Sequence, residues 1–246
     1  MANFVLVHGS FHGGWCWKPV VDRLEALGHR VLAPSLSGLA ERRDELSDRI
    51  DLYTHVEDIV EAVRAAELNQ FVLCGHSYGG MVITGVAERL VNAIAGIVYL
   101  DALIPEDAQS AADIYEFEAP AQLALSPVAV EMFAIADPKL SKWVSETMSP
   151  QPVRTLTQKL RVTGAYKRIP RKIHVAGTRV AQAPHELPGF HKSDTSINPV
   201  RRINERLSRE PGWTTVSADT GHHVMLDDPD LVVALLVLAA CAAPTA

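Results

Sequence analysis

The sequence predicts one α/β domain in which a mostly parallel six-stranded sheet carries helices on both faces. Short apolar runs alternate with stretches whose apolar residues recur at helical spacing, which is typical of parallel sheets with crossover helices. The alternation stops after Asp101 and resumes at Lys172, so a segment of different architecture interrupts the sheet. With 246 residues the chain is long enough for one large domain with an extensive apolar core.

The first two strands and the helix between them have clear end signals. Residues 4–7 form a short apolar run that leads into a glycine-rich loop. Residues 17–27 are apolar at helical spacing and precede Gly28, which suits the left-handed conformation at the end of a helix. Residues 30–34 predict the second strand. Its final proline ends the strand, because proline cannot donate a hydrogen bond to a neighbouring strand.

The next part of the chain predicts two more strands. Residues 54–57 read Thr-His-Val-Glu and fit a capping box, which would open a helix with one apolar face. The apolar run 71–74 predicts a buried strand, and a helical pattern follows it from Met81. Residues 95–100 predict the fourth strand, which ends at Asp101.

Residues 105–168 are predicted to form a helical cap inserted into the core, which would consist of residues 1–104 and 169–246. Helical patches in this segment are separated by prolines, and no stretch between them has a convincing strand pattern. After the cap, residues 172–176 predict a strand. A long loop, a helix over 199–209, a last strand over 214–217 and a C-terminal helix follow.

Charge and hydropathy exclude several classes of protein. The net charge of −6 and the absence of a basic run argue against nucleic-acid binding. The longest apolar stretch, residues 231–243, is shorter than the roughly 20 residues of a membrane-spanning helix. We predict a buried helix there, or in second place a contact in a homodimer. The chain begins without a secretory signal pattern, so we expect a cytoplasmic location.

The cysteines point to the same compartment. Cys16, Cys74 and Cys241 are far apart and have no C-x-x-C spacing. They are interpreted as reduced thiols in a cytosolic setting, and Cys74 as a core residue of its strand.

The segment Gly75-His76-Ser77-Tyr78-Gly79 fits the pattern G-x-S-x-G and lies where a strand turns into a helix. In that setting the serine occupies a tight, strained turn, and the two glycines remove clashes that side chains would cause. The hydroxyl points out at the carboxyl end of the strand, where the following helix directs its positive end. We predict Ser77 as a nucleophile; a plain surface turn is the alternative for the motif alone.

A serine hydroxyl needs a neighbouring base to act as a nucleophile at pH 7. In this architecture the base follows the last strand, where the chain has Gly221-His222-His223. We predict His222 as the base and His223 as a neighbour that lines the site. Adjacent histidines point apart, and no carboxylate or cysteine nearby completes a ligand set, which argues against a metal site. We expect no cofactor.

A carboxylate should orient the base. The loop after residues 172–176 offers Glu186 and Asp194. Asp194 is the first choice, because one predicted helix and one predicted strand separate it from His222 in the expected order of serine, acid and histidine. Asp101 is the alternative, because the carboxyl ends of all the strands meet at the site.

An acyl-transfer site also needs two backbone N–H groups for the negative oxygen of the transition state. Tyr78, the residue after the nucleophile, should supply one of them. Ser10, in the loop after the first strand, should supply the other, with Phe11 as second choice. His12 and Trp15 are expected to brace this loop by packing and hydrogen bonding.

Several segments of the chain resemble the α/β-hydrolases and, within them, the plant methylesterase and hydroxynitrile lyase group with its bacterial esterase relatives. The resemblance is good over the first 105 residues, moderate around His222, and poor over the cap and over the loop 178–194, which is longer than in the family. The matching segments are Val5-Leu6-Val7-His8-Gly9, His12-Gly13-Gly14-Trp15-Cys16-Trp17, Leu24-Glu25-Ala26-Leu27-Gly28-His29, Gly75-His76-Ser77-Tyr78-Gly79-Gly80 and Tyr99-Leu100-Asp101-Ala102.

The resemblance implies one of two reactions. The lyases that this chain resembles carry a threonine where Gly9 stands and a lysine where His223 stands, and those side chains hold the cyanohydrin hydroxyl and stabilise the released cyanide. Gly9 has no hydroxyl and His223 no fixed positive charge, so both departures favour an esterase. Gly9, Phe11 and His223 are predicted to contact the substrate.

The expected function is therefore hydrolysis of small to medium carboxylic esters with apolar or aromatic groups, through an acyl-enzyme on Ser77. A hydroxynitrile lyase is the first alternative, and a ligand-binding receptor on the same fold is the second. The apolar residues of the cap suggest a hydrophobic pocket, although we expect more than half of them to be cap core.

Overall fold

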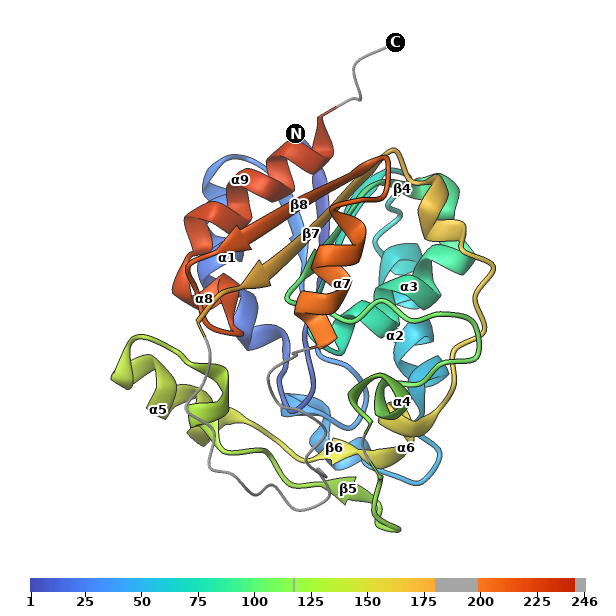
Figure 1. The fold of residues 1–246 in the computed structure, drawn as a ribbon, viewed down its shortest axis with the longest axis vertical. Helices are drawn as coiled ribbons and strands as arrows, with labels where there is room; N and C mark the ends of the chain where they lie inside the picture. The colour runs from blue at the N-terminus through green and yellow to red at the C-terminus, as the bar shows by residue number, and fades with distance from the viewer. Residues whose placement is uncertain (117, 180–198, 242–246) are drawn as a thin grey trace.

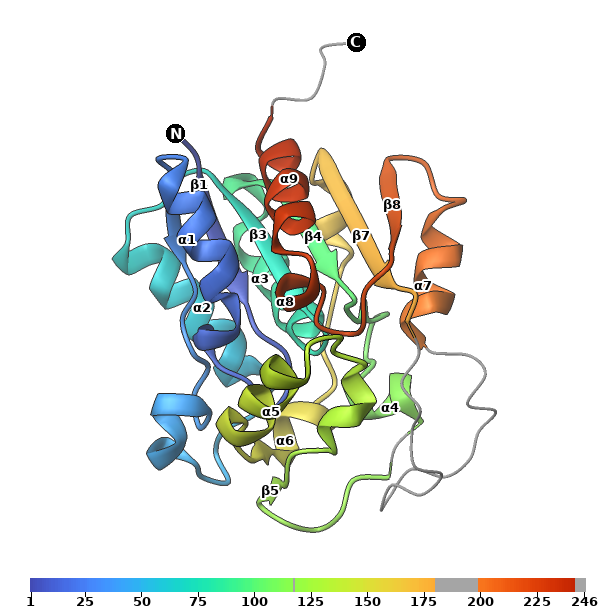
Figure 2. The same ribbon diagram turned by 90° about the vertical axis from the view of Figure 1, so that its left-hand side faces the viewer.

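The sheet confirms the predicted fold class and is parallel throughout. The computed structural model describes residues 1–116, 118–179 and 199–241. Six strands are arranged in the order β2-β1-β3-β4-β7-β8, and every pairing between them is parallel. All carboxyl ends therefore lie at one edge, which faces downward in Figures 1 and 2. The strands are β1 (Asn3–Val7), β2 (Arg30–Leu32), β3 (Phe71–His76), β4 (Ile94–Leu100), β7 (Arg171–Gly177) and β8 (Trp213–Ala218).

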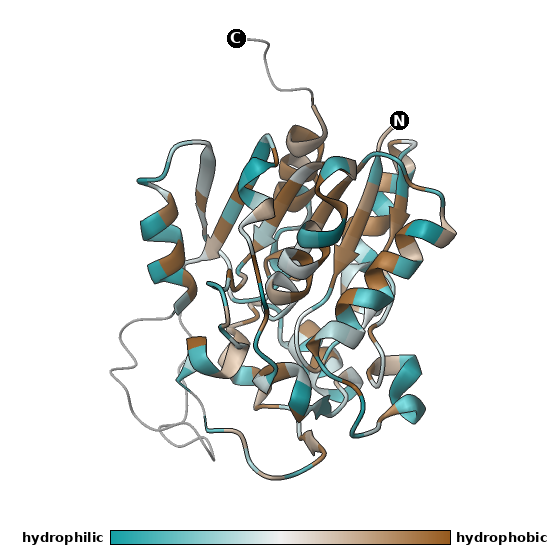
Figure 3. Cartoon of the chain, turned by 90° about the vertical axis from the view of Figure 1, so that its right-hand side faces the viewer, coloured by the Kyte–Doolittle hydropathy of each residue, from teal (hydrophilic) through white to brown (hydrophobic). Residues whose placement is uncertain are grey.

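Helices cover both faces of the sheet (Figures 1 and 2). One face carries α1 (Lys18–Ala26), α8 (Val224–Asp227) and α9 (Pro229–Ala240), and the other carries α2 (Leu52–Ala65), α3 (Gly79–Leu90) and α7 (Pro199–Leu207). Successive strand residues point to opposite faces, so each strand contributes to two separate cores. In β3, for example, Phe71 and Leu73 join one core while Val72 and Cys74 join the other. In Figure 3 the strands at the centre of the sheet are brown, the colour of hydrophobic residues.

The capping box at the start of α2 lies three residues earlier than predicted. The Asp51 side chain accepts a hydrogen bond from the Thr54 N–H at 3.1 Å, and the Thr54 hydroxyl accepts one from the Asp51 N–H at 3.2 Å. Thr54 is thus the third residue of the helix, and the prediction that it caps the helix with Glu57 was wrong. Aspartate is as good a cap as threonine, and here it is the residue with extended backbone, which a cap requires.

Residues 105–168, which we call the cap, leave the sheet at its carboxyl edge (Figures 1 and 2). The expectation of no strand in this segment was wrong, since β5 and β6 form an antiparallel pair. Each has two residues, too few to produce a strand pattern in the sequence. The elements are α4 (Ala111–Tyr115), β5 (Ala124–Leu125), η4 (Val130–Phe133), α5 (Pro138–Thr147), β6 (Gln151–Pro152), α6 (Val153–Thr157) and η5 (Ala165–Arg168).

Three short 3₁₀ helices, η1 (Gly14–Trp17), η2 (Ala40–Glu45) and η3 (Val91–Ala93), join elements of the core. Cys74 is fully buried in the core, as predicted, and Cys16, Cys74 and Cys241 are all free thiols. Helix α9 buries one side and leaves Leu238 43% exposed, so a homodimer contact there stays a prediction. Over the described ranges, no helix is both long and apolar enough to cross a membrane.

Candidate active site

Ser77 occupies a sharp turn between β3 and α3. Its backbone φ is +54°, a region that costs energy for a residue with a side chain. The Ser77 N–H donates to the Leu100 carbonyl at 3.2 Å and the Ser77 carbonyl accepts from the Leu103 N–H at 3.1 Å, so the end of β4 holds the turn. A Cβ on Gly75 would lie 2.6 Å from the Gly79 carbonyl oxygen. The strand, turn and helix predicted around this serine are therefore present, and Gly75 has the steric role expected of it.

His222 follows β8, and its ring is held on two sides. Its Nδ1 donates a hydrogen bond of 2.5 Å to Oδ2 of Asp101, which follows β4 and is 2% exposed. The other oxygen of Asp101 accepts from the Gly177 N–H at 2.9 Å. The Phe133 ring of the cap stacks on His222 with 5.7 Å between ring centroids, and the Phe133 carbonyl accepts the His222 N–H at 2.8 Å. Carboxylate and cap together fix the direction in which Nε2 points.

His76 connects this base to the serine turn. Its Nε2 donates to the His222 carbonyl at 2.9 Å, and the two rings lie 4.6 Å apart. Among the described residues, no hydrogen bond joins the Ser77 hydroxyl to His222 itself. In free enzymes such bonds are often long, and they tighten when the substrate binds.

The carboxylate beside the base is Asp101, the alternative that the sequence left open. Asp194, the first choice, lies outside the described residues, as does Glu186. Asp101 already occupies Nδ1 of His222. An imidazole that donates from Nδ1 to a carboxylate keeps Nε2 available for a proton. The geometry therefore favours Asp101, because order along the chain does not decide which acid reaches the ring.

The loop after β1 carries the N–H groups that were predicted as oxyanion donors. The Phe11 N–H donates to Oε1 of Gln151 at 3.0 Å, which removes Phe11 as an alternative donor. The N–H groups of Ser10 and Tyr78 donate to no acceptor in the described part of the chain. Their role as the two donors stays a prediction, as does substrate contact at Gly9, Phe11 and His223.

His12 braces this loop, as predicted. Its Nδ1 donates to the Ser10 carbonyl at 2.6 Å, and its ring stacks on Trp15 at 5.0 Å. Since a carbonyl can only accept, Nδ1 carries the proton of a neutral His12, and Nε2 then accepts from Nε2 of His223 at 2.7 Å. Burial lowers the pKa of His12 to about 4 and the pKa of His223 well below its ordinary value. Both rings are therefore neutral at pH 7.

Sequence reasoning missed two cap residues at this site, Tyr115 and Gln151. The Tyr115 hydroxyl contacts the Ser77 hydroxyl, and burial raises the pKa of Tyr115 to about 12, so this phenol keeps its proton at neutral pH. Ser110 and Asp113 form a capping box that starts α4, and this signal could have placed Tyr115 at the end of a helix. No local signal marks Gln151, which lies between two prolines.

In the part of the chain that the structure describes, four imidazoles gather around the serine turn. Five pairs among His12, His76, His222 and His223 have ring centroids 4.6 to 6.3 Å apart. Over the described ranges, no group of three or more histidine, cysteine, aspartate or glutamate side chains is placed to hold a metal ion.

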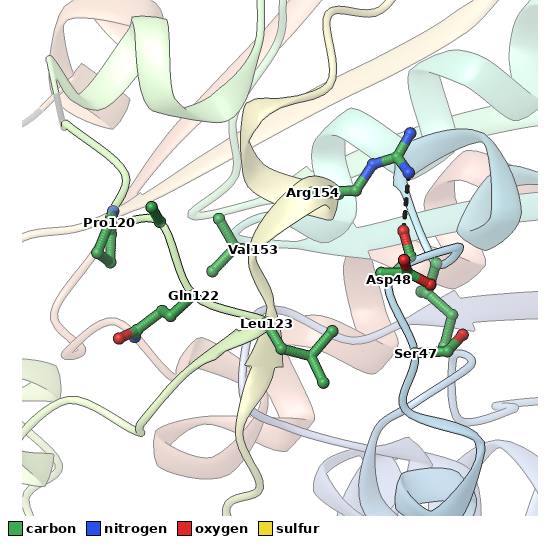
Figure 4. A pocket seen from close by; sticks show the side chains of 9 residues that line it. Ser47, Asp48, Pro120, Gln122, Leu123, Val153 and Arg154 are labelled. Atoms are coloured by element: carbon green, nitrogen blue, oxygen red, sulfur yellow. Dashed lines mark hydrogen bonds between the residues drawn. The ribbon is translucent and has the colours of Figure 1, made fainter.

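A separate cleft of about 430 Å³ opens between the loop that contains Ser47 and Asp48 and the part of the cap that contains Leu123 and Val153 (Figure 4). Arg154 crosses its rim and donates to the Asp48 carbonyl at 2.7 Å, the dashed line in Figure 4. None of the residues of the serine site lines this cleft. It is therefore not the pocket of the candidate active site.

Comparison with known proteins agrees with this geometry. The sequence model of the Alpha/beta hydrolase family matches residues 4–235. The chain belongs to this family. The Carbendazim hydrolyzing esterase of Nocardioides sp. (strain SG-4G) is 32% identical to it over 94% of this chain and 96% of that protein. Methylesterase 1 of Arabidopsis thaliana is 37% identical over 44% of this chain and 42% of that protein. The predicted resemblance to methylesterases and bacterial esterases is confirmed.

Solved structures of this hydrolase fold agree over nearly the whole chain. An extracellular alpha/beta-hydrolase from a Paenibacillus species has a TM-score of 0.74 and 23% identity, covering 97% of this chain and 99% of that chain. The methylesterase MES16 of Arabidopsis has a TM-score of 0.72 and 20% identity, covering 97% and 98%. At this level of identity the likeness shows the fold alone. A cytoplasmic location for the present hydrolase stays a prediction.

Proposed function

We propose that this α/β-hydrolase is a serine esterase that cleaves small to medium carboxylic esters with apolar or aromatic groups. One observation carries the proposal: Nδ1 of His222 is bonded to Asp101 beside a strained serine turn that has two glycines around it. Two relatives support the same reaction. One matches almost the full length of the chain and the other nearly half of it, and both are named as esterases.

In the proposed reaction Ser77 Oγ attacks the ester carbonyl while His222 takes its proton at Nε2. Asp101 keeps the ring oriented and stabilises the imidazolium that forms. The N–H groups of Ser10 and Tyr78 stabilise the negative oxygen of the tetrahedral intermediate. His222 then protonates the departing alcohol, and the acyl group stays on Ser77. A water molecule that gives a proton to His222 attacks this acyl-enzyme. The C–O bond to Ser77 then breaks, His222 returns the proton to Ser77 Oγ, and the acid is released.

Two features support the esterase over the lyase. A Cβ on Gly9 would lie 2.9 Å from both Nδ1 of His76 and Cβ of Ser77, so a threonine at this position would require the turn to move. His223 is fully buried, and its lowered pKa keeps it neutral, so it offers no fixed positive charge for cyanide.

The test is turnover of a panel of p-nitrophenyl esters from acetate to octanoate by the wild type and by Ser77→Ala. We expect Ser77→Ala to lower kcat by about 10⁴-fold or more, because the nucleophile is lost. Ser208→Ala is the matched control, since the Ser208 hydroxyl bonds only within an exposed helix end. The wild type should also gain one acyl mass on Ser77 during the reaction.

Each other outcome contradicts the proposal in its own way. Near-native turnover by Ser77→Ala would end the nucleophile assignment. Cyanide release from mandelonitrile that exceeds ester turnover would favour the lyase. Less than one turnover per molecule across the whole panel would favour a receptor.

A further inference from the structure

We propose that Gln151, a buried glutamine of the cap, is a positioning residue that sets the oxyanion hole of the core. The proposal rests on the proposed esterase function, since an oxyanion hole matters only for acyl transfer. It gives the cap a second role besides covering the site.

The cap holds both peptide groups of Phe11. Gln151 is 0% exposed, and its Oε1 accepts the Phe11 N–H at 3.0 Å, while the Ser149 N–H donates to the Phe11 carbonyl at 2.9 Å. Phe11 has a φ of +67°, the left-handed region, which costs a bulky residue roughly 1–3 kcal/mol. Such a conformation persists only where the surroundings hold it, and here the holding groups come from the cap.

These bonds fix the peptide planes on either side of Ser10. His8 Nδ1 donates to the Gly9 carbonyl at 2.8 Å, and this carbonyl belongs to the same peptide plane as the Ser10 N–H. In the next plane His12 binds the Ser10 carbonyl at 2.6 Å and Gln151 binds the Phe11 N–H. The other polar groups of these two described planes are bonded, which leaves the Ser10 N–H as their one donor without an acceptor.

The same glutamine is linked to the other predicted donor residue, Tyr78. Nε2 of Gln151 donates to the Thr155 hydroxyl at 2.6 Å, and that hydroxyl donates to the Pro152 carbonyl at 2.6 Å. The Thr155 hydroxyl also contacts the phenol of Tyr78, whose oxygen lies 3.0 Å from Nδ1 of His55. One buried pair, Gln151 and Thr155, thus contacts the residue after Ser10 and the side chain of Tyr78. Ser10 and Tyr78 are the two residues that should supply the oxyanion donors.

The position requires an acceptor of this length. A backbone N–H can bond only to the oxygen of the amide, so the Gln151 amide has one possible orientation. A methionine of similar shape would leave the Phe11 N–H buried and unpaired, which would allow the strained Phe11 peptide to turn and the Ser10 N–H to swing away. A glutamate would keep an acceptor for Phe11 and could accept from the Thr155 hydroxyl instead.

The experiment compares Gln151→Met and Gln151→Glu with the wild type, with Gln122→Met as the matched control. Gln122 is an exposed glutamine of the same cap that bonds to the Ala124 carbonyl. The readouts are kcat and KM for a p-nitrophenyl ester, and the affinity for a trifluoromethyl ketone that adds to Ser77 as a tetrahedral oxyanion. Rates are divided by the number of active sites, counted by complete labelling with a fluorophosphonate.

We expect Gln151→Met to lower kcat by roughly 10- to 100-fold, less than the loss of a whole oxyanion donor, and to change KM by less than about twofold. The affinity for the ketone should fall by the same factor as kcat, because both report the stabilisation of the oxyanion. Gln151→Glu should restore most of both values, and Gln122→Met should change neither.

An unchanged kcat per active site in Gln151→Met, with only a lower Tm, would show a merely structural role and overturn the proposal. So would an effect on KM alone, which would place Gln151 in substrate binding. If Gln151→Met does not fold, Gln151→Asn takes its place. The asparagine side chain is one methylene shorter, so its amide no longer reaches the Phe11 N–H and kcat should fall by the same factor. Ser77→Ala distinguishes a failure of the proposed esterase function from a failure of the Gln151 proposal. If Ser77 is not the nucleophile, Ser77→Ala retains the wild-type turnover.

Discussion

The serine turn and the groups that surround it are built in opposite ways. Gly75, Ser77 and Gly79 lie within five residues of one another, and the turn depends on the absence of side chains. The surrounding groups are joined across the chain: the bond between His222 and Asp101 spans 121 positions, and the bond between Phe11 and Gln151 spans 140. The first region should fail when volume is added, and the second when a polar group is removed.

After the loss of Ser77 itself, the largest loss of kcat is expected from Asp101→Asn. An asparagine keeps the size of the side chain but offers an amide to His222 Nδ1, which favours the wrong tautomer of the ring. We expect kcat to fall by about 10³- to 10⁴-fold with little change in Tm. Circular dichroism and ester turnover on the same samples measure both quantities.

Asp194→Asn is the matched change in the loop that the sequence favoured. It should alter kcat by less than about twofold, because His222 Nδ1 already has Asp101 as its partner. A large loss in Asp194→Asn together with a small loss in Asp101→Asn would transfer the acid role to the loop and reverse our assignment.

The turn itself should break by steric crowding. In Gly75→Ala the new Cβ would lie 2.6 Å from a backbone oxygen of Gly79 and 3.0 Å from Cδ1 of Ile83. Overpacking of this kind costs about 1–3 kcal/mol, so thermal melting should show Tm lower by roughly 2–12 °C. Activity should fall with it, because the backbone that must move holds Ser77.

Gly28→Ala is the control for this change. Gly28 has nothing within 4 Å of an added Cβ, although its φ of +79° still disfavours a side chain by about 1–2 kcal/mol. We expect its Tm to fall less than that of Gly75→Ala and its kcat to stay at the wild-type value. Equal loss of activity in the two variants would contradict a specific steric role for Gly75.

The smallest effect is expected from Glu88→Gln, which should lower stability where the cap returns to the core. Glu88 of α3 accepts hydrogen bonds at 2.6 to 3.1 Å from the Thr163 hydroxyl and from the N–H groups of Thr163, Gly164 and Ala165. Burial alone would raise the pKa of Glu88, but these bonds outweigh it and lower the pKa below its ordinary value. Glu88→Gln should therefore reduce stability at pH 7 by about 1–2 kcal/mol, since the amide can accept fewer of these bonds.

The sign of the pH dependence follows from the lowered pKa. The contribution of Glu88 is complete above the ordinary glutamate pKa of about 4.3 and is lost as the pH falls through the lower value of the folded protein. The Tm difference between the wild type and Glu88→Gln should hence narrow below about pH 4. The exposed Glu25→Gln is the control, and a difference that widens in acid would contradict the argument.

Much of the core could be predicted, because side-chain periodicity and turn sterics depend on residues that are close in sequence. The alternation of apolar runs predicted each strand of the sheet to within a few residues, and the G-x-S-x-G segment placed Ser77 between β3 and α3. The predicted start of α2 was wrong, and so was the prediction that the cap has no strands. At the start of α2, Asp51 and Thr54 were equally suitable as capping residues. In the cap, the strands β5 and β6 were too short to form a pattern in the sequence.

The sequence by itself determined the sheet, the serine turn and the position of His222 after the last strand, because steric limits and side-chain periodicity depend on neighbours along the chain. Only the tertiary structure brought Asp101 to His222, the Tyr115 hydroxyl to Ser77 and Gln151 to the strained peptide of Phe11. These contacts depend on how parallel strands end at one edge and how the cap folds back over it. Their distances are therefore fixed by packing between segments that no local pattern relates.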